Sequence, residues 1–145
     1  MYDFKYVTKK EASAEKNNII ALIHDVQDDV REEFTLSFFF VGSTKNNMNT
    51  QDPSTNIGFD FDVDLQINRP DEFKPKYLRK RIKKAIDKVA PKYGYGPAED
   101  STRVLTIKKK DVEESKIIHS ADFAIVREEK KYVHFNKKDN LYMWE

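Results

Sequence analysis

Apolar residues recur at helical spacing in two segments of the chain. From Glu11 to Phe34 they return at three- and four-residue steps, which places them along one face of a helix. That stripe is formed by Ile19, Ile23, Val26, Val30 and Phe34, with Leu22 beside it. A second amphipathic helix is predicted from Lys76 to Ala90 and is ended by Pro91. Its inward residues are Leu78, Ile82, Ala85, Ile86 and Val89.

Between these helices the pattern changes to that of strands. The continuous apolar run "LSFFFV", Leu36 to Val41, predicts a buried strand that ends at Gly42. Thr44 to Gly58 is rich in Asn, Thr, Ser, Asp and Pro and predicts a loop. Phe59 to Ile67 alternates strictly, so that its apolar residues point one way and Asp60, Asp62, Asp64 and Gln66 point the other.

A run of strands completes the chain. We predict strands at Arg103 to Ile107, Ile117 to Val126 and Lys131 to Phe135, with Leu141 to Trp144 the least regular. The order is thus helix, strand, loop, strand, helix and further strands. It predicts an α/β (α+β) fold with a mixed sheet of about four to five strands and helices mainly on one face.

Composition narrows the class of protein. The chain has 145 residues, 39% of them apolar and 35% charged, which suits one domain with one core. A net charge of +1 gives no global field for nucleic acid or membrane, and the lack of cysteine excludes disulfides and thiolate metal sites. No apolar run approaches the roughly 20 residues of a membrane helix. The N-terminal segment has no signal-peptide pattern, so we expect a soluble, cytoplasmic protein.

Three aspartates on one side of a strand are the feature that most needs explaining. Asp60, Asp62 and Asp64 would repel one another and lose hydration there unless a cation lies beside them. Magnesium in phosphate chemistry is typically held by one or two carboxylates together with substrate phosphates. Asp122, in "ADFAIV", is an unusual charge for a buried strand and is the candidate third carboxylate of a two-metal site.

These segments together resemble a known family. "FFFVGS", then "FDFDVDL", a helix and a later strand with "ADFAIV" look like the nucleotidyltransferase superfamily of DNA polymerase beta type. Within it they are most similar to the branch of oligoadenylate synthases, cyclic GMP–AMP synthase and bacterial cyclic-oligonucleotide synthases. The resemblance covers Ile19 to Val126. It implies one nucleotidyltransferase catalytic core over residues 1–145, with a longer parent chain and a C-terminal helical domain as the alternative to a short protein.

The resemblance also implies roles for individual residues. Gly42 would let the backbone approach the triphosphate, and Ser43 would bind phosphate oxygens. The strand aspartates would hold two Mg²⁺ ions, with Mn²⁺ as a substitute, and Asp122 would bind one ion and orient the attacking hydroxyl. The implied reaction transfers a nucleoside monophosphate from a nucleoside triphosphate to a hydroxyl and releases pyrophosphate, and the base of the donor stays open. The acceptor stays open among a nucleotide, RNA, a protein and a small molecule.

Several alternatives remain at the level of sequence. Both Asp60/Asp62 and Asp62/Asp64 fit the family's acidic pair, and the segment after Ser43 is longer than the family's usual stretch. The aspartate strand could instead be an edge strand with a solvated acidic face, and Asp122 a strand-end residue or the ion-pair partner of Arg103. Ser43 could be a turn residue.

The second helix is unusually basic, which raises a different class of function. The basic segment 74–92 contains Lys74, Lys76, Arg79, Lys80, Arg81, Lys83, Lys84, Lys88 and Lys92. We interpret it as a solvated face, with nucleic-acid binding as the alternative. His24, His119 and His134 lack metal-ligand spacing and are interpreted as structural. A catalytically inactive relative that binds nucleotide or nucleic acid is the second hypothesis for the whole chain.

Overall fold

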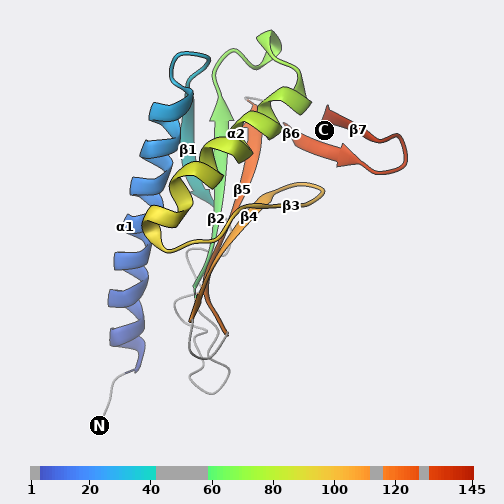
Figure 1. Cartoon of the computed structure of the whole chain (residues 1–145). Helices are drawn as coiled ribbons and strands as arrows, with labels where there is room; N and C mark the ends of the chain where they lie inside the picture. Colours follow the sequence, from blue (N-terminus) through green and yellow to red (C-terminus); the bar gives the residue numbers. More distant parts are fainter. Residues whose placement is uncertain (1–3, 42–58, 112–115, 128–130) are drawn as a thin grey trace.

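The elements of the fold are shown in Figure 1 on a computed structural model, which describes residues 4–41, 59–111, 116–127 and 131–145. The helices are α1 (Phe4–Val30) and α2 (Pro75–Val89), with short 3₁₀ turns η3 (Pro70–Glu72) and η4 (Ala90–Tyr93). The strands are β1 (Leu36–Val41), β2 (Phe59–Ile67), β3 (Glu99–Asp100), β4 (Leu105–Asp111), β5 (Lys116–Arg127), β6 (Lys131–Asn136) and β7 (Leu141–Trp144). This content confirms the predicted α+β class.

The strands form a mixed sheet in the order β1-β2-β5-β4-β3. β2 and β5 are parallel, and the other neighbours are antiparallel. β6 pairs with the end of β5 and continues into the hairpin with β7. β2 therefore has a hydrogen-bonded neighbour on each side, so the alternative of an edge strand for the aspartates is wrong.

Both helices cover the same face of the sheet (Figure 1). The predicted apolar stripe of α1 is buried, and Leu78, Ile82, Ala85 and Ile86 of α2 are fully buried as predicted. They meet the alternate apolar side chains of the central strands. These are Phe61, Val63, Leu65 and Ile67 of β2, Ala121, Phe123 and Ile125 of β5, and Leu105 and Ile107 of β4. The period-two pattern of β2 thus places a row of apolar side chains under the helices and a row of polar side chains on the opposite face.

Several element boundaries differ from the sequence prediction, and the short strand β3 was not predicted. α1 ends at Val30, so Phe34 of the predicted stripe lies beyond the helix. α1 begins at Phe4, because the Lys-, Glu- and Ala-rich segment before Ile19 favours helix without showing an apolar stripe. β4 begins at Leu105 rather than Arg103. The residues before it form a turn in which the Ser101 amide donates to the Val104 carbonyl at 3.0 Å, and the Ser101 hydroxyl donates to the same oxygen at 2.9 Å.

One cation of α2 lies inside the molecule. The Arg79 side chain is 1% exposed, and its guanidinium donates to the Asp100 carboxylate at 2.6 Å. It also donates to the carbonyl oxygens of Ser101 at 2.8 Å, Thr102 at 3.2 Å and Val133 at 2.7 Å. Arg79 therefore joins α2 to the turn before β4 and to β6, and it satisfies carbonyl groups that would otherwise be buried without partners.

We expect Arg79→Met to lower the free energy of unfolding by about 3–5 kcal/mol, because it leaves the Asp100 carboxylate and three carbonyl groups without their donor. Urea unfolding followed by circular dichroism measures this change. Lys84→Met on the same helix is the matched control, since Lys84 is exposed, and it should change the value by less than about 0.5 kcal/mol. Equal effects of the two variants would contradict a structural role for Arg79.

Candidate functional site: an acidic face on two parallel strands

The face of the sheet opposite the helices carries a group of carboxylates, which we call the acidic face: Asp60, Asp62 and Asp64 of β2 and Asp122 of β5. The parallel register of these strands pairs Asp62 directly with Asp122 and Asp60 with Ser120. Paired residues of neighbouring strands project from the same side of a sheet. The structure therefore places on one face of the sheet the four aspartates that the sequence singled out.

Hydroxyl groups hold two of these carboxylates. Thr106 of β4 pairs with Asp122 in the antiparallel register, and its Oγ1 donates to Asp122 Oδ1 at 2.6 Å. Ser120 Oγ donates to Asp60 Oδ1. Lys108 lies two residues beyond Thr106 in β4 and binds Glu99 of β3, with its Nζ 3.2 Å from Oε1. The positive charge of Lys108 also acts on Asp122.

The electrostatics of the acidic face oppose full ionisation. Burial raises the pKa of Asp64, and the neighbouring charge of Asp62 raises it further. The pKa of Asp122 is also raised, by burial above all; the Thr106 hydrogen bond opposes this shift, while the charges of Asp62 and Asp60 add to it. Asp62 thus acts on both neighbours, as expected for the central carboxylate of the group.

The carboxylates do not form a closed metal cage. Across residues 4–41, 59–111, 116–127 and 131–145, no three acidic or histidine side chains converge on one point as ligands of an ion. The donor chemistry still suits magnesium, which prefers carboxylate oxygens and usually keeps positions for water and substrate phosphates. Gly42 and Ser43, the predicted phosphate-binding residues, lie outside the described residues.

The alternatives for Asp122 can now be compared with the structure. Asp122 lies well inside β5 rather than at its end, which excludes a strand-end role.

Sequence analysis missed Thr106, Lys108 and Ser120, because their relation to the aspartates depends on the strand register. Once β4 and β5 are aligned, the alternation of polar and apolar residues in "LTIK" places Thr106 and Lys108 on the acidic face.

The cations of segment 74–92 are largely paired within the molecule. Acidic residues of α1 and of the turn after it supply most of the partners: Arg81 binds Asp29 and Glu33, Lys88 binds Asp29, and Lys92 binds Asp25. Lys83 pairs with Asp87 inside α2. This pairing across the two helices supports a structural role for much of the basic face. The structure gives no observation in favour of nucleic-acid binding there.

The histidines lie apart from the acidic face or point away from it. His119 faces the helices, where its Nε2 lies 3.7 Å from Glu15 Oε1, and burial lowers its pKa. His24 contacts Gln27, with the two side chains 2.9 Å apart, and His134 lies 2.8 Å from Glu145. These contacts agree with the structural interpretation of all three histidines.

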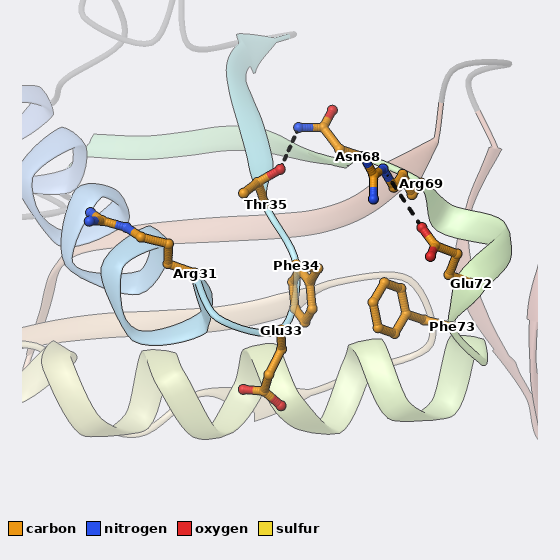
Figure 2. Close-up of a pocket in the computed structure, with 8 residues that line it drawn as sticks. All are labelled: Arg31, Glu33, Phe34, Thr35, Asn68, Arg69, Glu72 and Phe73. Carbon is orange, nitrogen blue, oxygen red and sulfur yellow. Dashed lines mark hydrogen bonds and ion pairs between the residues drawn. The ribbon is translucent and has the colours of Figure 1, made fainter.

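A cavity of about 520 Å³ lies between the end of α1 and the start of η3 and α2 (Figure 2). Phe34 and Phe73 line it, with ring centroids 5.4 Å apart. At its rim Asn68 Nδ2 donates to Thr35 Oγ1 at 2.7 Å (Figure 2). Its lining includes none of the aspartates of the acidic face, so the cavity is separate from the candidate site.

Comparison with solved structures identifies the class of fold. The CD-NTase CdnG of Bradyrhizobium diazoefficiens, solved in complex with GTP, matches 95% of this chain with a TM-score of 0.64 and 19% identity. The GTP-bound form of Vibrio cholerae DncV matches 99% with a TM-score of 0.54 and 17% identity. DncV, a cyclic AMP-GMP synthase, also matches in its complex with the linear intermediate pppA(3′,5′)pG, with a TM-score of 0.53 and 16% identity.

These likenesses show a shared nucleotidyltransferase-type fold and confirm the fold resemblance drawn from the sequence. The chain spans 39% of the CdnG chain and 42% of the GTP-bound DncV chain. No protein-family model matches its sequence, and no curated protein matches it. In the described part of the chain, no helix is long and apolar enough to cross a membrane.

Removal of the central charge should stabilise the protein when divalent cations are absent. Asp62→Asn relieves repulsion with Asp64 and Asp122, so we expect the free energy of unfolding at pH 7 to rise by about 0.2–1 kcal/mol per relieved pair. Urea unfolding in EDTA tests this. Glu32→Gln changes the net charge equally at an exposed position and should have little effect.

The same variant should alter the pH dependence of stability. Because the folded-state pKa values of Asp64 and Asp122 are raised, their ionisation costs stability at neutral pH, and this cost disappears as pH falls through those values. The advantage of Asp62→Asn over wild type should therefore shrink as pH falls toward the ordinary aspartate range. An advantage that is constant with pH would contradict charge repulsion as its cause.

Proposed function

We propose that this chain is the catalytic core of a magnesium-dependent nucleotidyltransferase. It would transfer a nucleoside monophosphate from a nucleoside triphosphate to a hydroxyl acceptor and release pyrophosphate. The observation that carries the proposal is the register of β2 and β5, which places Asp62 directly beside Asp122 with two more aspartates on the same face. The fold shared with GTP-bound CD-NTase structures supports the general class of enzyme and a nucleoside triphosphate as partner.

The acidic face would hold the metal through few protein ligands. Asp62 and Asp122 are the core of the proposed ligand set, and the nucleotide's phosphates and water would complete the coordination. Bound Mg²⁺, or Mn²⁺ in its place, would neutralise phosphate charge and lower the pKa of the acceptor hydroxyl. Asp122 is the residue proposed to orient that hydroxyl and accept its proton, since raised carboxylate pKa values suit a general base. Gly42 and Ser43 keep their proposed contact with the phosphates.

Between the two acidic pairs that the sequence allowed, we favour Asp60 and Asp62. The charges of both raise the pKa of Asp122, and Asp64 is not among the groups that shift it. Asp64 follows Asp62 by two residues in β2, and its register partners are the apolar Phe39 of β1 and Ala124 of β5. Ser120 in addition fixes the Asp60 carboxylate toward β5. Asp64 is then a neighbour whose charge adds to the field of the site.

Isothermal titration of ATP and GTP into the full chain, with Mg²⁺ and with EDTA, tests the proposed nucleotide site. We expect binding that requires Mg²⁺ and is lost in Asp62→Asn, because a triphosphate and the carboxylates repel each other without a cation. Glu32→Gln should bind like wild type. Nucleotide binding by Asp62→Asn with Mg²⁺, or by wild type in EDTA, that is as tight as wild-type binding with Mg²⁺ would overturn the metal site.

Turnover separates an enzyme from an inactive relative. Pyrophosphate release from ATP or GTP, abolished by Asp122→Asn, would support the transferase. Mg²⁺-dependent binding without pyrophosphate release, tested with nucleotide, RNA, protein and small-molecule hydroxyls as acceptors, would favour the second hypothesis, a catalytically inactive nucleotide-binding relative.

Paired variants test the choice of ligands. We expect Asp60→Asn to weaken Mn²⁺ binding by at least about 10-fold, as the loss of a charged ligand should, and Asp64→Asn to weaken it less. Titration of Mn²⁺ followed by electron paramagnetic resonance measures both affinities. The reverse order of effects would assign the metal to Asp62 and Asp64 instead.

A further inference from the structure

Thr106 constrains a carboxylate of the acidic face through a direct hydrogen bond. It lies in β4, opposite Asp122 in the antiparallel register, and its Oγ1 donates to Asp122 Oδ1 at 2.6 Å. Leu105 and Ile107, on either side of it in the sequence, are fully buried on the helix-covered face. The packing of these two neighbours fixes the β4 backbone, and a β-branched side chain has few χ1 rotamers available. The hydroxyl is therefore held in place before any ligand arrives.

The hydrogen bond acts on the geometry and on the charge of Asp122. It occupies one oxygen of the carboxylate and thereby sets the rotation of the group. Burial and the charges of Asp62 and Asp60 disfavour the ionised form of Asp122, and the Thr106 hydroxyl opposes them. A donor to a metal-binding carboxylate typically orients it and tunes its affinity for the ion.

We propose that Thr106 is a positioning residue of the nucleotidyl-transfer site, which binds Asp122 Oδ1 and leaves Oδ2 for the divalent cation and the acceptor hydroxyl. This inference rests on the proposed function, because it assigns a task to Asp122 as metal ligand. Thr106 itself contacts neither the metal nor the nucleotide. Its effect passes through the carboxylate that it orients.

Two substitutions separate the hydroxyl from the shape of the side chain. Thr106→Val keeps the branched shape and strand preference but removes the donor, whereas Thr106→Ser keeps the donor. Thr35→Val is a matched control. It also removes a hydrogen-bonded threonine hydroxyl, the acceptor for Asn68 Nδ2, but one at the rim of the separate cavity (Figure 2). Circular dichroism and thermal melting establish that each variant is folded.

The measurement is the affinity of the full chain for Mn²⁺, determined by titration with electron paramagnetic resonance and without nucleotide. We expect Thr106→Val to weaken Mn²⁺ binding about 10- to 100-fold, with Thr106→Ser and Thr35→Val close to wild type. In an Asp122→Asn background, Thr106→Val should cause no further loss. This pattern would support a role exerted through Asp122.

Other outcomes are distinguishable. Equal losses in Thr106→Val and Thr106→Ser would assign the effect to strand packing and overturn the inference, as would wild-type affinity in Thr106→Val. In both cases Mn²⁺ binding by the wild-type protein and its loss in Asp62→Asn would leave the proposed function standing. A folded wild-type protein that binds neither Mn²⁺ nor Mg²⁺–nucleotide would overturn the proposed function and this inference with it.

Discussion

The parallel pairing of β2 with β5 is the constraint on which both the core and the candidate site depend. The register that sets Val63 beside Phe123 under the helices also sets Asp62 beside Asp122 on the opposite face. A slip of one residue would exchange the two faces of a strand and bring a carboxylate into the core. Burial of the apolar side chains therefore specifies the register. The arrangement of the carboxylates on the acidic face follows from that register and does not help to set it.

Carboxylates on the two faces of the sheet have pKa values shifted in opposite directions. On the helix-covered face, Glu15 accepts a hydrogen bond from Tyr95 at 2.5 Å and from Lys109 at 2.8 Å. Burial alone would raise the pKa of Glu15, yet these bonds and the nearby His119 bring it below its usual range. On the acidic face the balance is reversed, and Asp64 and Asp122 have raised pKa values. Carboxylates whose pKa values are shifted by burial and by like charges are common at functional sites.

The sequence predicted what depends on periodicity and missed what depends on partners distant in the chain. Sequence analysis predicted the apolar stripes of α1 and α2 and the alternation of β2, because each of these patterns repeats a local geometry several times. Arg79 looked like one more cation of a basic helix, and its burial follows from carbonyl groups that β6 and the turn before β4 bring to it. The same reason explains why Asp25, Asp29 and Glu33 were not recognised as partners of segment 74–92, since they lie in α1 or the turn after it, far away in the chain.

In the candidate site, too, the sequence predicted the residues with a local pattern and missed those whose partners are distant in the chain. Four aspartates could be named from their pattern alone, but the hydroxyls of Thr106 and Ser120 could not be connected with them before the strand order was known. The choice between Asp60 and Asp64 also had no basis in sequence, because both fit the same alternation. It becomes a physical question once β5 lies beside β2, since the charge of Asp60 then raises the pKa of Asp122 and Asp64 is not among the groups that shift it.

The distribution of charge gives the site its proposed dependence on a cation. A net charge of +1 conceals a separation in which Arg81, Lys88 and Lys92 are paired with acids of α1 while the acidic face stays predominantly negative. A triphosphate approaching that face meets like charge, and Lys108, the cation beside Asp122, is already bound to Glu99. In the proposed function, attraction comes from an ion that binds carboxylate and phosphate oxygens together, which is the coordination that magnesium favours. On this electrostatic ground nucleotide affinity and metal affinity should be coupled, each ligand strengthening the binding of the other.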